Sequence, residues 1–260
     1  MDSVENTKLL QITNIVGFAA VVIVNILANA LPINGKTTAE LSDSYPNLFV
    51  PAGYVFAIWG VIYILLLAFT VYQASAKRRG AQFLGRIGWL FGISCAANVV
   101  WIFLWHYELV FPSLIAMFAL LGSLILIYLR LDIGRGSPSR EERLYIHLPF
   151  SVYLGWITVA PIANVVAALV SIKWDGFGLG EVTWTVAIIA VAVILTLLNI
   201  QTRGDVGYSL VIIWALGGIV VKQMAIQSIV ATAGIGIVVL AAFLTFKKLR
   251  GLAPQGRMWP

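Results

Sequence analysis

The sequence is poor in charge. Asp, Glu, Lys and Arg make up 11% of its 260 residues, whereas 60% are hydrophobic. A soluble domain carries about 25% charged residues, which it needs to solvate its surface. The low fraction excludes an ordinary soluble protein and indicates an integral membrane protein whose first partner is the lipid bilayer.

Residue types that carry catalysis or bind metal are equally scarce. Cys95 is the only cysteine, so no disulfide can form within the chain, and His106 and His147 are the only histidines. One cysteine and two histidines do not give the spacing of metal ligands, nor do they form a Ser–His–Asp or Cys–His catalytic set. No Asp or Glu lies within an apolar run, which argues against a proton relay or an ion-coupled pump. We therefore expect no enzyme, no metal site and no required cofactor.

Long apolar runs are abundant by contrast. They fall at about 10–31, 54–76, 86–105, 110–129, 146–171, 183–200, 206–222 and 225–246. About 20 apolar residues cross the roughly 30 Å of bilayer hydrocarbon as a helix. The sequence therefore predicts an all-α polytopic membrane protein with eight transmembrane helices. The short break "TRGD" (202–205) leaves open a kink in place of a turn.

The basic residues are distributed unevenly along the predicted spans. If the N-terminus lies inside, only Lys36, Lys173 and Lys222 of the 17 Lys and Arg residues fall outside. Basic residues collect on the cytoplasmic side of membrane proteins. We therefore expect both termini to be cytoplasmic, and the net charge of +6 to mark sidedness rather than a nucleic-acid partner. The compact loops suggest a prokaryotic plasma membrane.

The chain also divides by composition. Of nine tryptophans, only three follow residue 175, which suggests a unit over 1–174 and a second unit of three helices and a basic tail over 175–260. The longest loop, 32–53, contains three prolines and reads as irregular chain. A loop of this length is expected to be a disordered tether or a lid.

Aromatic and amide side chains gather in "AANVVWIFLWHYE" (96–108). Asn98, Trp101 and Trp105 are spaced i, i+3 and i+7, so they share one helix face. They are compatible with a lipid anchor, a polar clamp between helices or the wall of a pocket. These three interpretations remain open at this point.

Two further segments repeat the pattern. "VPAGYVFAIWGVIY" (50–63) places Phe56, Trp59 and Tyr63 at the same spacing, and 148–164 places Tyr153, Trp156 and Asn164 in one helix. Each set alone is compatible with core packing. If the three sets converge, they form a flat-walled apolar cavity with a few amide groups, which suits a planar aromatic ligand.

These segments resemble the TspO/MBR family, the tryptophan-rich sensory proteins related to the peripheral benzodiazepine receptor. The resemblance covers about residues 10–174 and rests on the proline-led aromatic pattern of 51–63, on Asn98 with Trp101, and on Trp156 with Asn164 eight positions later. It implies a five-helix bundle with loop 32–53 as the lid of its pocket, followed here by three additional helices.

The resemblance implies a receptor or carrier for a flat apolar ligand, such as a porphyrin, a haem precursor or a sterol. The expected ligand-binding residues are Tyr54, Phe56, Trp59, Tyr63, Asn98, Trp101, Trp105, Tyr153, Trp156 and Asn164. Porphyrin transport, porphyrin breakdown and signalling have all been proposed for the family. Two alternatives stay open: a small-solute transporter, and a scaffold that acts through a homodimer or another membrane protein.

Overall fold

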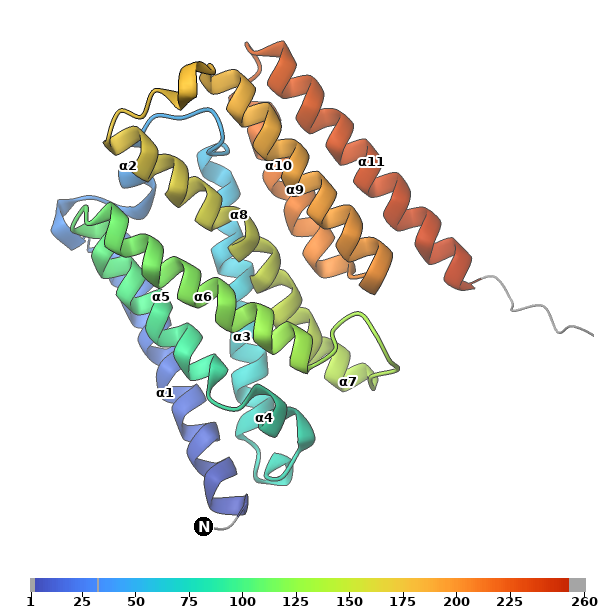
Figure 1. The fold of residues 1–260 in the computed structure, drawn as a ribbon. Coiled ribbons are helices and arrows are strands. Elements are labelled where there is room, and N and C mark those ends of the chain that lie inside the picture. Colours follow the sequence, from blue (N-terminus) through green and yellow to red (C-terminus); the bar gives the residue numbers. More distant parts are fainter. Residues whose placement is uncertain (1–2, 32, 253–260) are drawn as a thin grey trace, which may run out of the picture.

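The computed structural model describes residues 3–31 and 33–252, and these are helical almost throughout (Figure 1). The long helices are α1 (Ser3–Ala30), α3 (Ile58–Ala74), α5 (Leu90–His106), α6 (Val110–Arg130), α8 (Leu148–Ser171), α9 (Glu181–Arg203), α10 (Val206–Lys222) and α11 (Gln227–Leu252). The short ones are α2 (Thr38–Asp43), α4 (Gln82–Ile87) and α7 (Arg140–Glu142). The predicted all-α fold is confirmed.

Six of the helices in the described residues are long and apolar enough to cross a membrane. One of the six segments joins the 3₁₀ turn η2 (Gly53–Ala57) to α3, and another joins α7 and a π-helical turn (Arg143–His147) to α8. Helices α5 and α10 are apolar but have 17 residues each, which is about 26 Å of helix. The count of eight spans stays a prediction for these two.

Five helices form a closed ring. Helix α1 packs against α3 and α5, α5 against α6, α6 against α8, and α8 back against α3. Helix α10 packs on the outside of this ring against α8, and α9 and α11 pack against α10 (Figure 1). The three C-terminal helices therefore form a second group, held to the ring mainly through one helix pair.

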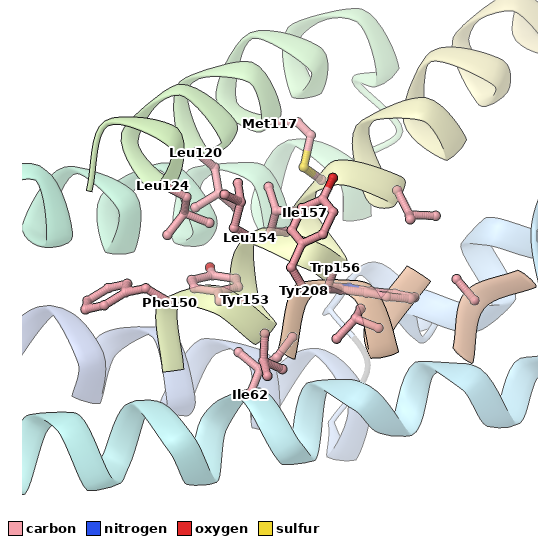
Figure 2. Close-up of a cluster of buried hydrophobic side chains, with 14 of the residues drawn as sticks. Ile62, Met117, Leu120, Leu124, Phe150, Tyr153, Leu154, Trp156, Ile157 and Tyr208 are labelled. Atoms are coloured by element: carbon pink, nitrogen blue, oxygen red, sulfur yellow. The ribbon is translucent and has the colours of Figure 1, made fainter. Parts of the chain in front are cut away.

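Helix α8 is the centre of the molecule. All nine residues from Pro149 to Ile157 are buried, so no face of this stretch is left for lipid. Figure 2 shows why: its residues meet Ile62 from α3, Met117 and Leu120 from α6, and Tyr208 from α10. A helix that is apolar all round is stable only when neighbours cover every face.

Small residues let α8 and α10 approach closely. A Cβ added at Gly155 would lie 3.0 Å from the carbonyl oxygen of Tyr208, and one added at Gly207 would strike the Ser151 hydroxyl. Close backbone approach through small residues is the usual means by which helices associate in membranes. At this contact, the small residues of the C-terminal helices serve packing within the chain.

The break at 202–205 is a turn and not a kink. Gly204 ends α9 in the left-handed conformation (φ 64°), and Asp205 caps α10 by accepting from the backbone N–H of Tyr208 at 3.3 Å. The Asp205 side chain is only 6% exposed. It also accepts from the hydroxyls of Ser151 (2.5 Å) and Tyr128 (2.8 Å), so one carboxylate joins α10 to α8 and α6.

One predicted boundary was wrong. The third run was expected to begin at residue 86, but α4 ends at Ile87 and α5 begins at Leu90. Gly88 separates them with φ 53° and ψ −136°, a conformation that side chains other than glycine's rarely permit. The apolar pattern runs across this glycine, so hydrophobicity alone does not reveal the break.

Candidate ligand-binding site

The three aromatic segments converge on Trp59 in α3. The centroid of its ring lies 5.7 Å from Tyr63, 6.5 Å from Trp101, and 6.1 Å from both Tyr153 and Trp156. These separations are typical of stacked and edge-to-face aromatic pairs. Residues from α3, α5 and α8 that are far apart in sequence thus form one aromatic cluster.

A cavity of about 50 Å³ lies beside this cluster, toward the lid. Side chains of the ring helices and of the loop between α1 and α3 enclose it. Its lining residues are Thr38, Ser42, Asn47, Val50, Pro51, Phe56, Trp59, Trp101, Trp105, Trp156, Val159, Ala160, Ala163, Asn164 and Ala167. Helix α8 contributes Trp156, Asn164 and a set of small aliphatic residues to the wall, and α3 and α5 contribute further tryptophans.

The loop between α1 and α3 covers the cavity, as the lid prediction requires. Pro32, the first residue of the predicted loop 32–53, lies outside the described residues. The lid holds helix α2, which begins with a capping box: Thr37 accepts from the Glu40 N–H, and the Glu40 carboxylate accepts from the Thr37 N–H at 2.7 Å. This hydrogen bond from the Thr37 backbone lowers the pKa of Glu40 below its usual value. Loop 33–57 is therefore an ordered structure and not a tether.

His106 and Glu108 attach the lid to the end of α5. His106 is fully buried; its Nδ1 lies 3.1 Å from the Ile33 carbonyl oxygen and its Nε2 lies 3.1 Å from the Thr38 hydroxyl. Lys36 forms an ion pair with Glu108 at 2.8 Å, and the hydrogen bond in this pair raises the pKa of Lys36. His106 thus holds the lid against α5, a role that the sequence around it does not indicate.

Helix α10 holds the other side of the lid. Its Gly218 carbonyl accepts from the Ala52 N–H at 3.1 Å, and Gln223 donates to the Leu48 carbonyl at 3.1 Å. A Cβ at Gly218 would overlap Val55 and would lie 2.9 Å from the Cβ of Pro51. The C-terminal helices therefore reach the candidate site through the lid.

Two amide networks support the cluster. Trp101 donates its indole N–H to Asn164 Oδ1 at 2.9 Å, and Asn164 donates to the Ser113 hydroxyl at 3.1 Å. One turn deeper, Asn98 accepts from Asn25 of α1 at 2.9 Å and donates to the Tyr153 hydroxyl at 3.3 Å. Asn98 is thus a clamp between helices, whereas Trp101 is part of the cavity wall.

Two indole N–H groups at the cavity have no partner. Trp105 and Trp156 line it and are 5% and 3% exposed, yet neither Nε1 atom has a hydrogen-bond acceptor among the described residues. A buried donor without an acceptor costs about 1–3 kcal/mol. Such groups are rare in native proteins, and each calls for an explanation.

The chain matches the model of the TSPO-like protein family over residues 11–246. The chain belongs to the TSPO-like protein family. The matched stretch is not confined to 10–174, where the sequence motifs lie, but continues through α9 and α10 into α11. Comparisons with curated proteins and with solved structures gave no match. This TSPO-like protein is thus an integral membrane protein with a large aromatic cluster.

The structure of the TSPO-like protein divides the ten predicted residues into three groups. Phe56, Trp59, Trp101, Trp105, Trp156 and Asn164 line the cavity. Tyr63, Asn98 and Tyr153 lie behind it, in contact with the lining residues or with one another. Tyr54 lies apart: it is 50% exposed and packs edge-on against Trp214 of α10.

Sequence reasoning missed part of the site of this TSPO-like protein. Ala160, Ala163 and Ala167 follow the i, i+3, i+7 spacing of the aromatic sets, and this small-residue stripe on the tryptophan-bearing helix was a usable signal. The lid residues Thr38, Ser42 and Asn47 carried no such signal, because their position over the cavity depends on contacts with α5 and α10.

Proposed function

We propose that this protein is a membrane receptor or carrier for a flat apolar ligand that bears an oxygen acceptor, such as a porphyrin or haem precursor with carboxylate or carbonyl groups. The ligand would lie against the tryptophans of the aromatic cluster, beneath the lid. Family membership and the aromatic cavity support this proposal.

The observation that carries the proposal is the pair of unpartnered indole N–H groups of Trp105 and Trp156. Both residues line the same cavity. An oxygen atom of a ligand that accepts from them would remove the cost of leaving these donors unsatisfied. A purely hydrocarbon ligand would not.

Binding requires the lid to move. Pockets for small organic ligands usually measure about 300–1,000 Å³, whereas this cavity measures about 50 Å³. In this proposal the structure corresponds to the closed position of the lid. The lid is the element that opens, because individual hydrogen bonds and two ion pairs, Lys36–Glu108 and Lys222–Asp43, hold it to α5 and α10.

The chemistry of the wall favours binding over catalysis. The described residues that line the cavity offer indole, amide and hydroxyl groups and no acid, base or thiol. We propose that the protein acts without side-chain catalysis and without a required cofactor. By the positive-inside rule, we also propose that the end of the bundle with the basic residues faces the cytoplasm.

The test is a fluorescence titration of the purified protein with protoporphyrin IX and with a porphyrin that carries only alkyl groups. We expect saturable tryptophan quenching at micromolar protoporphyrin IX, and affinity about tenfold lower in a Trp105→Phe/Trp156→Phe variant, which lacks both donors. The alkyl porphyrin should bind more weakly and should not distinguish the variant.

Trp89→Phe is the matched control. Trp89 is 47% exposed and does not line the cavity, so its loss should leave the affinity unchanged. Linear quenching without saturation, equal in all three proteins, would overturn the proposal.

A further inference from the structure

A second cavity lies at the opposite end of the bundle from the lid. It measures about 240 Å³ and is lined by α4 and by the segment 131–147 that leads from α6 to α8. Helix α4 and this segment lie at the end of the bundle away from α2 (Figure 1). Its polar lining residues include Gln82, Arg86, Asp132, Arg135, Glu142 and His147. We refer to it as the basic-end pocket. It shares no lining residue with the aromatic cavity.

The nitrogen donors that line the pocket are largely without partners. Among the described residues, Arg86 has no hydrogen bond or ion pair, and Arg135 uses only its Nε, which donates to the Thr202 carbonyl at 3.3 Å. His147, on the π-helical turn, is half-buried and its ring has no hydrogen-bond partner in the described chain. Single π-helical turns within helices often mark functional sites.

The carboxylates of the pocket are engaged elsewhere. Asp132 pairs with Arg203 at 3.3 Å, and Glu142 accepts from the Ser139 N–H at 3.0 Å in a capping box. Within residues 3–31 and 33–252 no three His, Cys, Asp or Glu side chains are placed to hold a metal ion. Each carboxylate is thus engaged through one oxygen, whereas the guanidinium groups of Arg86 and Arg135 keep most of their donors free, and such donors bind an anion.

We propose that the basic-end pocket binds a phosphate group, with Arg86 and Arg135 as its principal ligands and His147 as a further donor. Guanidinium groups bind phosphate oxygens through two parallel N–H bonds, which a point charge cannot do. Lys77, Arg78 and Arg79 precede α4 in the chain and do not line the pocket. Basic pockets between transmembrane helices on the cytoplasmic side commonly bind the headgroups of anionic lipids.

The phosphate has two sources, a lipid headgroup or a soluble phosphate ester, and the experiment separates them. In one arm, native mass spectrometry of the full-length protein in detergent compares retention of phosphatidylglycerol with that of phosphatidylcholine. In the other, thermal unfolding is followed in inorganic phosphate and in chloride at equal ionic strength. Preference for phosphatidylglycerol alone identifies a headgroup, and stabilisation by phosphate alone identifies a soluble ester; both outcomes support a phosphate site.

Variants test whether the basic-end pocket itself is responsible for the lipid retention or the stabilisation by phosphate. Arg86→Gln/Arg135→Gln should weaken binding about tenfold or more. Lys77→Gln/Arg79→Gln removes the same charge from exposed residues outside the pocket and should change binding less than about twofold. Arg86→Gln alone serves as a second variant, because this side chain has no hydrogen bond or ion pair among the described residues. Absence of preference in both arms, or equal loss in the two double variants, would overturn the proposal.

Discussion

At the residue scale, two tryptophans one helical turn apart differ in whether the indole N–H has a hydrogen-bond acceptor. Trp101 and Trp105 lie on one face of α5, and their rings stack at 6.3 Å. Trp101 donates to Asn164, whereas Trp105 has no acceptor. The first is therefore part of the structural network, and the second is available to a ligand.

We expect Trp101→Phe to lower the free energy of unfolding by about 1 kcal/mol more than Trp105→Phe does. Both changes remove similar apolar volume, but only the first breaks a hydrogen bond and leaves Asn164 with one partner fewer. Equilibrium unfolding in detergent measures the difference. Equal losses in the two variants would show that the Trp101–Asn164 bond contributes no net stability.

At the scale of the element, the lid bridges helices α5 and α10. It is fixed to α5 through His106 and to α10 through Gly218 and Gln223. Because α10 belongs to the C-terminal group, the additional helices contact the lid of the candidate site directly. We infer that α10 sets how readily the lid opens.

Replacing Gly218 with alanine should loosen the lid. The added Cβ would overlap Val55 and crowd Pro51, so the segment must shift and the Ala52–Gly218 hydrogen bond should weaken. We expect backbone amides 52–57 to exchange with deuterium about tenfold faster. Gly217→Ala is the control, because a Cβ there meets open space; equally fast exchange in both variants would point to general loosening of α10 instead.

At the scale of the whole molecule, the ring of five helices and the C-terminal group are joined around Asp205. Its carboxylate accepts from α6, α8 and its own helix at once. The glycines at the α8–α10 contact bring the backbones close enough for these bonds to form. The ring and the C-terminal group are thus in direct contact through this carboxylate.

Asp205→Ala should destabilise the protein by about 2–4 kcal/mol, because it removes a helix cap and leaves the Tyr128 and Ser151 hydroxyls without their acceptor. Thermal unfolding in detergent checks this. Asp175→Ala removes a cap on an exposed turn and should cost less than about 1 kcal/mol. A similar small loss at Asp205 would mean that the joint depends on apolar packing alone.

The sequence by itself determined the membrane character, the helical class and the aromatic spacing, because these follow from composition and from periodicity within single helices. It also indicated the lid and six of the residues that line the cavity. The tertiary structure alone decided which polar groups have partners. Trp101 has an acceptor for its indole N–H because Asn164, 63 positions away, lies beside it. Asp205 lies in the break between two apolar runs, and its carboxylate has partners because Tyr128 of α6 and Ser151 of α8 donate to it. Hydrogen bonding and burial depend on neighbours that are distant in the chain, and no local pattern records them.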